Sequence, residues 1–172
     1  MLPTYHWRKK ITMKRRARDL WKLDETELKE KMEKGVLIHE ILAGIETTAD
    51  IEKAVDDQYR LGLIHSEERI EFSGLITGLM NIEYSKGKVG DWFKPGLVVK
   101  NEKTIASRHR EWRPDRVLID DSRTIVIDYK TGQKDPGHLT QINEYGDLLQ
   151  EMGYENIEKY LLYLESREVV EG

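Results

Sequence analysis

The 172-residue sequence contains no cysteine, which excludes disulfide bridges, cysteine zinc sites, cysteine nucleophiles and iron–sulfur clusters. Proline is scarce, at 4 residues, and no low-complexity linker or internal repeat divides the chain. No run approaches the roughly 18 apolar residues of a membrane span, and no charged-then-apolar leader opens the sequence. No phosphate-binding P-loop (GxxxxGK[S/T]) occurs, so the chain carries no ATPase of its own. We therefore expect a soluble, cytoplasmic protein without a membrane partner.

The composition is that of a polar globular domain. Hydrophobic residues make up 38% of the chain and charged residues 35%, which is too apolar for a disordered segment. A chain of this length buries about 70% of the surface that its unfolded form exposes, so it can hold a real core. The sequence predicts one folded domain over residues 24–172.

Charge is distributed unevenly along the chain. Residues 1–22 hold eight Lys and Arg against one Asp, a net charge of +7, which leaves −11 for the rest of a chain whose total is −4. A basic arm on an acidic body is a candidate contact for DNA or for an attached protein domain, and the alternative is a solvated helix or tail. We interpret residues 1–23 as a basic N-terminal arm or connecting helix.

Hydrophobic periodicity changes from helical to strand-like along the chain. Apolar residues at helical spacing predict helices over residues 25–44, 48–63 and 66–84, with Ile70, Leu75 and Leu79 facing inward in the third. The second half alternates short apolar runs with turns and one amphipathic helix. The predicted strands cover 97–99, 104–106, 116–119, 124–127, 160–164 and 168–170, with the helix over 138–152. This order predicts an α/β (α+β) fold with a mixed central β-sheet flanked by helices.

Two acids and a lysine stand at the ends of two adjacent predicted strands. A tight turn at residues 120–123 makes these strands a hairpin, which brings Asp115 back beside Asp128. Asp128 and Lys130 are two residues apart on one strand, so their side chains share a face. The two carboxylates could share Mg²⁺ or Mn²⁺, and Lys130 could assist a water in phosphodiester cleavage. Spacing alone also allows a second interpretation, in which these are ordinary hairpin charges.

The same residues belong to a longer pattern. Pro114-Asp115 followed by Asp128-Tyr129-Lys130 resembles the PD-(D/E)XK nuclease superfamily. The string RPDRVLID…TIVIDYKTG resembles its RecB-like nuclease domain, as found at the C-terminus of bacterial UvrD/RecB-type helicase–nucleases such as exonuclease V and AddAB-like enzymes. The resemblance implies a restriction-endonuclease-like core.

Three other segments fit this family. Residues 35–39 resemble its GxxxH helix, residues 101–103 its acid-bearing strand, and residues 141–145 its QxxxY motif. Residues 111–113 depart from it, because many members place a glycine there. The absence of cysteine excludes the branch that carries an iron–sulfur cluster.

The resemblance implies a role for each matched residue. It implies the catalytic residues Asp115, Asp128, Lys130, Gln141 and Tyr145, and the metal ligands His39, Asp115, Asp128 and the backbone carbonyl of Tyr129. Gln141 and Tyr145 would orient Lys130 or bind the DNA backbone. Without the resemblance to this family, His39 would be interpreted as a core histidine, and Gln141 and Tyr145 as the polar edge of an amphipathic helix. Of all these assignments, the role of Glu102 as the acid of the preceding strand has the weakest support from the resemblance.

The function implied by the resemblance is a Mg²⁺- or Mn²⁺-dependent DNA nuclease. It would be an exonuclease module of an ATP-dependent helicase–nuclease in bacterial recombination and repair, associated with the nucleoid. Its partners would be single-stranded or unwound DNA and helicase domains. One alternative is a catalytically inactive nuclease-fold module that binds DNA or a helicase. Another is an unrelated α/β protein with a coincidental D…DxK.

Overall fold

A computed structural model describes the backbone of residues 25–101, 105–106, 111–120 and 122–172, and the side chains of these ranges except 25–32, 105–106 and 111–112. The basic arm and Glu102 therefore lie outside the described residues. The helices are α1 (Glu25–Ala43), η3 (Thr48–Asp50), α2 (Ile51–Arg60), α3 (Ser66–Met80), η4 (Val89–Phe93) and α4 (Pro136–Glu151). The strands are β1 (Glu83–Tyr84), β2 (Gly87–Lys88), β3 (Val98–Asn101), β4 (Ile105–Ala106), β5 (Glu111–Trp112), β6 (Arg116–Ile119), β7 (Thr124–Lys130), β8 (Ile157–Tyr163) and β9 (Glu168–Glu171).

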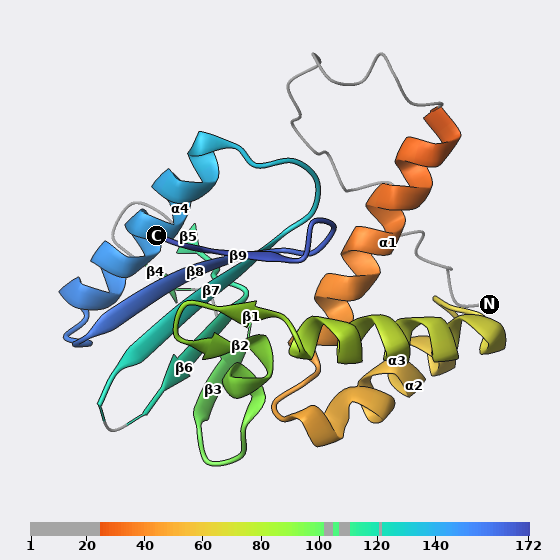
Figure 1. Ribbon diagram of the computed structural model, residues 1–172, viewed down its shortest axis with the longest axis horizontal. Coiled ribbons are helices and arrows are strands. Elements are labelled where there is room, and N and C mark those ends of the chain that lie inside the picture. Colours follow the sequence, from red (N-terminus) through yellow and green to blue (C-terminus); the bar gives the residue numbers. More distant parts are fainter. Residues whose placement is uncertain (1–24, 102–104, 107–110, 121) are drawn as a thin grey trace, which may run out of the picture.

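The centre of the fold is a five-stranded mixed sheet in the order β3-β6-β7-β8-β9 (Figure 1). β7 and β8 are parallel, and the other neighbouring pairs are antiparallel. Parallel neighbours need a crossover, and α4 supplies it, running back from the C-terminal end of β7 to the start of β8. The prediction of an α/β fold with a mixed sheet flanked by helices is confirmed at this level.

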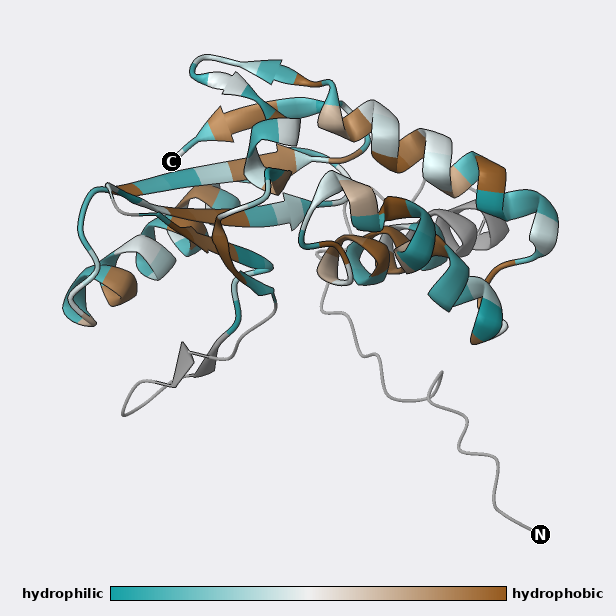
Figure 2. Cartoon of the chain, turned by 90° about the horizontal axis from the view of Figure 1, so that it is seen from below, coloured by the Kyte–Doolittle hydropathy of each residue, from teal (hydrophilic) through white to brown (hydrophobic). Residues whose placement is uncertain are grey.

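Helices cover both faces of the sheet (Figures 1 and 2). Residues Ile125, Ile127 and Tyr129 of β7 belong to the larger core, together with buried side chains of α1, α2, α3 and η4. Val126 belongs to the smaller core, which α4 covers. Because side chains alternate along a strand, Asp128 and Lys130 lie in phase with Val126, on the face that α4 covers.

Arg116, at the start of β6, joins the helical layer to the sheet. Its side chain is completely buried. The guanidinium donates to the backbone oxygens of Ile45 and Glu46, which follow α1, and to that of Trp92 in η4. It also donates to the side-chain oxygen of Asn101 at the end of β3. Arg116 is therefore an internal cross-link rather than a hairpin surface charge.

The third predicted helix differs from the structure in its end and in its buried face. It ends at Met80, and β1 and β2 form a small hairpin directly after it. Ile70 is 82% exposed, so the prediction that it faces inward is wrong. An α-helix turns about 100° per residue. Ile70 therefore lies about 200° from the buried Phe72, on the opposite side of the helix.

The predicted strand over residues 104–106 is also placed differently. β4 pairs with β5 in a separate two-stranded sheet, while β3 pairs with β6 in the central sheet. The runs at 97–99 and 104–106 therefore contribute to different sheets. No helix within the described ranges is long and apolar enough to cross a lipid bilayer.

Candidate functional site

The C-terminal edge of β7 brings two carboxylates together. Asp128 lies on β7 and is 4% exposed. Asp115 directly precedes β6, and the pairing of Arg116 with Ile127 places Asp115 opposite Asp128 by extension. The backbone N–H of Tyr129 donates to Asp115 Oδ2 at 2.6 Å, which holds that carboxylate at the edge of the sheet. Ligands of α/β sheets commonly bind at this edge, beyond the carboxyl ends of the strands.

Lys130 is held beside Asp128 by two side chains of α4. Its Nζ is in ion-pair contact with Asp128 Oδ2 and donates to Gln141 Oε1 at 2.7 Å. Gln141 Nε2 in turn donates to Tyr145 OH at 2.8 Å. Because Tyr145 is buried in the smaller core, the chain of hydrogen bonds fixes the lysine ammonium to the body of the protein.

The Asp128 carboxylate is unusual because it is almost completely buried. Burial and, to a smaller extent, the charge of Asp115 raise its pKa to about 6, against the opposing effect of Lys130. Although Oδ2 contacts the Lys130 ammonium, it is buried without a hydrogen bond of regular geometry. The carboxylate pair therefore favours an additional positive charge at this position.

His39 reaches the same carboxylates from the helical side of the sheet. Its Nδ1 lies 3.6 Å from Asp115 Oδ1, and its ring meets the Tyr129 ring edge-on at a centroid distance of 5.7 Å. Gly35 lies one turn earlier on α1. A Cβ at that position would lie 2.7 Å from Thr131 Cγ2, so with a threonine at position 131 a glycine lets α1 approach the end of β7 this closely. The GxxxH spacing thus has a geometric reason.

Replacing Gly35 with alanine is expected to displace α1 from β7 and to destabilise the protein by about 1–2 kcal/mol. Overpacking of this kind typically costs about 1–3 kcal/mol, and the better helix propensity of alanine returns up to about 1 kcal/mol. Thr131→Ser removes the methyl group that the new Cβ would meet. The double variant should therefore regain most of the loss in urea unfolding, and additive effects of the two substitutions would contradict this packing account.

The donors at this edge fit a hard divalent cation. Asp115, Asp128 and the Tyr129 carbonyl offer oxygen atoms, which Mg²⁺ and Mn²⁺ prefer, and the buried Asp128 Oδ2 lacks a regular hydrogen bond. Among the residues that the structure describes, however, no three His, Cys, Asp or Glu side chains form a metal-binding group. The Lys130 ammonium is the cation in contact with Asp128 Oδ2.

The structure thus brings His39, Asp115, Asp128 and Lys130 to one edge, with Gln141 and Tyr145 behind the lysine. Sequence reasoning missed one residue beside this group, His138. Its Nδ1 lies 3.1 Å from Tyr163 OH, and Lys130 acts on it electrostatically. The only sequence signal for His138 is its position one turn before Gln141, on the same side of α4.

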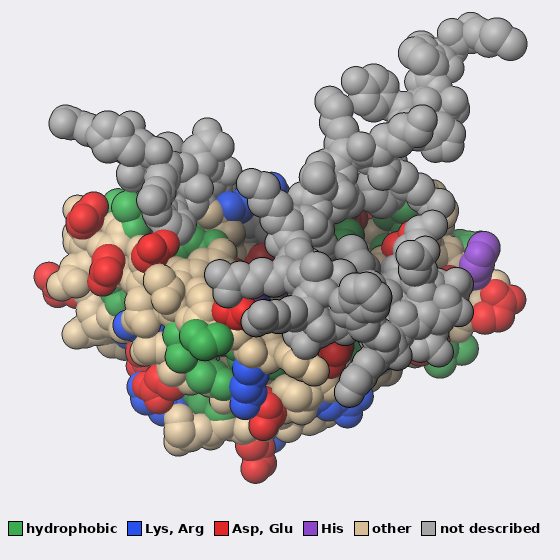
Figure 3. All heavy atoms as spheres, turned by 90° about the horizontal axis from the view of Figure 1, so that it is seen from above, with side chains coloured by type: hydrophobic (Ala, Val, Ile, Leu, Met, Phe, Trp, Pro, Cys, Tyr) green, Lys and Arg blue, Asp and Glu red, His purple; other side chains and the backbone are tan. Residues whose placement is uncertain are grey.

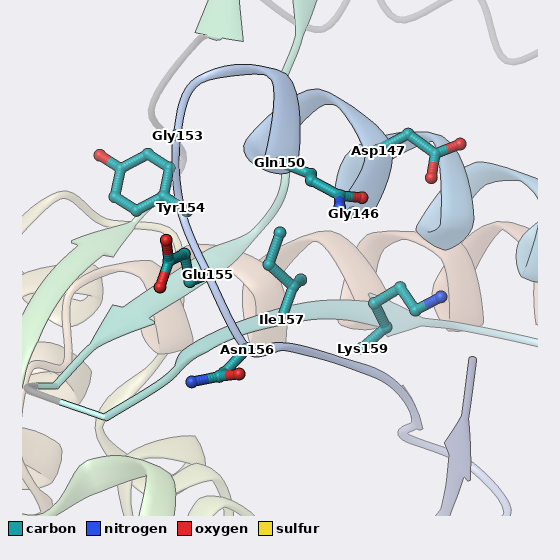
Figure 4. A pocket seen from close by; sticks show the side chains of 9 residues that line it. All are labelled: Gly146, Asp147, Gln150, Gly153, Tyr154, Glu155, Asn156, Ile157 and Lys159. Atoms are coloured by element: carbon teal, nitrogen blue, oxygen red, sulfur yellow. The ribbon is translucent and has the colours of Figure 1, made fainter.

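A hollow of about 540 Å³ lies at the other end of α4, away from these residues (Figure 4). It is bounded by Gly146, Asp147 and Gln150 of α4 and by residues 153–157 before and at the start of β8. Figure 4 shows Tyr154 and Glu155 at one end of it and Asp147 and Lys159 at the other. The carboxylates and the lysine of the site do not line it.

No protein-family model matches this chain, and a search of curated proteins finds no match to it.

Proposed function

We propose that this chain is a metal-dependent DNA nuclease domain of the RecB-like PD-(D/E)XK type with a restriction-endonuclease-like core. The observation that carries the proposal is the buried carboxylate of Asp128 beside Asp115, in contact with Lys130. A mixed sheet with helices on both faces agrees with such a core. Ordinary hairpin charges would be solvated, whereas Asp128 is buried at an energetic cost that a function can explain.

The metal would be held by Asp115, Asp128, the carbonyl of Tyr129 and His39. A bound Mg²⁺ or Mn²⁺ supplies Lewis-acid stabilisation of the charge on a phosphate and lowers the pKa of a coordinated water. The contribution of the chain itself is to hold two carboxylates at one edge, through the Tyr129 N–H and the β6–β7 pairing.

Lys130 has two tasks in this proposal. Its ammonium orients the attacking water, and it stabilises the negative charge that grows on the phosphate in the transition state. Gln141 and Tyr145 hold the ammonium in position, which lowers the entropy lost when the substrate binds. The role of these two residues is therefore to position Lys130 rather than to exchange protons.

The substrate would be single-stranded or unwound DNA, delivered by helicase domains of a larger polypeptide or complex. Figure 3 shows carboxylates scattered over the visible part of one face, and residues outside the basic arm carry a net charge of −11. A DNA strand would therefore be attracted locally, at the lysine and the metal, and by the arm in residues 1–22. Such phosphate contacts make binding weaken as salt rises.

The test is cleavage of end-labelled single-stranded DNA by the purified protein with Mg²⁺ or Mn²⁺. We expect cleavage that EDTA abolishes and that Lys130→Ala lowers by about 10²–10³-fold, the usual cost of losing one group that stabilises charge in the transition state. The matched control is Lys159→Ala. Lys159 also extends from a strand to an amide side chain of α4, that of Asn143, but not to the carboxylates. Absence of cleavage would refute the enzyme and favour the inactive binding module, and cleavage that survives Lys130→Ala would refute the role proposed for this lysine.

A further inference from the structure

His138 lies at the first turn of α4, beside the proposed site but outside every motif found in the sequence. It is half-buried, and its Nδ1 is 3.1 Å from the hydroxyl of Tyr163, the last residue of β8. The two rings pack at a centroid distance of 5.8 Å. His138, Gln141 and Tyr145 follow one another at spacings of three and four, so they form one row along α4. Lys130 touches the middle of that row.

The contact with the Tyr163 hydroxyl favours one tautomer of the His138 imidazole. Burial raises the pKa of Tyr163, so its hydroxyl keeps its proton and has one hydrogen to donate. The nearby acceptor is His138 Nδ1. A neutral imidazole that accepts at Nδ1 carries its hydrogen on Nε2.

The charges around His138 keep the imidazole neutral near pH 7. Burial lowers its pKa, and the positive charge of Lys130 on β7 lowers it further, while Asp135 opposes the shift. Tyr163 faces it from β8. Lys134, which lies over the Tyr163 ring, is paired with Glu168 of β9 at 2.8 Å. The Nε2–H is thus a neutral donor, and no residue in the described part of the chain accepts a hydrogen bond from it.

We propose that His138 is a further substrate-binding residue, whose Nε2–H donates to a phosphate oxygen of a single DNA strand. The proposal rests on the proposed function for the identity of the ligand. Lys130 would lie at the reacting phosphate, and His138 begins the same row of α4 side chains, so it is placed for a neighbouring phosphate of that strand. Tyr163 is a positioning residue, because it acts only by holding the imidazole in this tautomer.

The experiment measures binding of fluorescein-labelled oligothymidine by anisotropy, in EDTA and at low salt, so that cleavage does not contribute. His138→Phe should weaken binding by about tenfold or more, the effect of losing one hydrogen bond to a charged oxygen. His138→Gln keeps an N–H donor and should lose less. The affinity of Tyr163→Phe should lie between those of the wild type and His138→Phe. Nitrogen NMR of the wild type should show the hydrogen of His138 on Nε2, and Tyr163→Phe should lower the population of this tautomer.

The matched control is His65→Phe, because His65 is an exposed histidine at the start of α3 and should bind DNA as the wild type does. Equal affinity of His138→Phe and wild type, an equal loss in His65→Phe, or no DNA binding by the wild type would overturn the inference. Mg²⁺-dependent cleavage by the wild type is scored separately. Cleavage with unaltered binding by His138→Phe refutes only the inference, whereas weakened binding without any cleavage refutes only the nuclease.

Discussion

Replacing Asp128 with asparagine is expected to lower Mg²⁺-dependent cleavage of single-stranded DNA by at least about 10³-fold. The substitution keeps the shape of the side chain and removes a negative charge from the proposed metal site. Removing a residue that acts as part of one catalytic unit typically costs several orders of magnitude. The loss should appear in kcat, because metal and lysine act on the transition state.

The same substitution should change the free energy of unfolding by less than about 2 kcal/mol. Two effects oppose one another. Asp128→Asn relieves the burial of a charge next to Asp115, and it also removes the ion-pair partner of Lys130. A large loss of activity with a small change in stability separates a functional carboxylate from a structural one.

Asp147→Asn is the control for this experiment, because Asp147 is an exposed carboxylate on α4 away from the site. It should retain full activity. A second readout is the rise of the melting temperature with Mn²⁺, which the wild type should show because a ligand that binds only the folded state stabilises it. Asp128→Asn should lose this rise. An Asp128→Asn protein that cleaves DNA within tenfold of the wild type would be incompatible with the proposed role.

Local patterns were sufficient to predict the part of the site that lies on one hairpin. The runs at 116–119 and 124–127 with a tight turn between them appear in the structure as β6 and β7, paired antiparallel. The turn is stabilised by Asp120, whose side chain accepts hydrogen bonds from the backbone N–H groups of Ser122 and Arg123. Strand periodicity then placed Asp128 and Lys130 on one face without any knowledge of the tertiary fold.

Features that depend on distant packing could not be predicted in the same way. The partners of Arg116 on the α1 side lie about 70 positions away in the chain, and nothing near Arg116 in the sequence marks it as buried. Trp92 is fully buried in a short 3-10 helix that has no hydrophobic periodicity to detect. The prediction that Ile70 faces inward was wrong for a related reason. Several phases of the helical wheel were compatible with the apolar residues of α3, and the packing partners decided among them.

Replacing Arg116 with methionine is expected to destabilise the protein by about 3–5 kcal/mol, a large share of the 5–15 kcal/mol that holds a typical domain together. Methionine fills much of the volume but donates no hydrogen bond. Three backbone oxygens, those of Ile45, Glu46 and Trp92, would lose their guanidinium donor, along with the side chain of Asn101. Each buried polar group left unpaired costs about 1–3 kcal/mol, and part of this is recovered by relaxation.

Lysine should not rescue this position, although it keeps the positive charge. The Arg116 guanidinium is planar, reaches partners in three segments of the chain at once and lies 4.0 Å from the centre of the Phe93 ring. A lysine ammonium is a compact point charge that cannot match this geometry. It is also more strongly hydrated, so its burial costs more. We expect Arg116→Lys to lose about 2 kcal/mol or more.

Urea unfolding measures the free energy of unfolding of both variants. If unfolding remains two-state, the midpoint urea concentration should fall while the slope of the free energy against urea stays unchanged. Arg123→Met is the matched control, because Arg123 lies at the other end of the β6–β7 hairpin and forms exposed ion pairs with Asp120 and Glu158. Pairs of that kind contribute about 0–1 kcal/mol each. An Arg116→Met protein within about 1 kcal/mol of wild type would contradict the cross-link. Arg116 directly follows Asp115, and its guanidinium binds the segment that follows α1, the helix that carries His39. The stability of the fold and the geometry of the proposed site therefore depend on the same buried guanidinium.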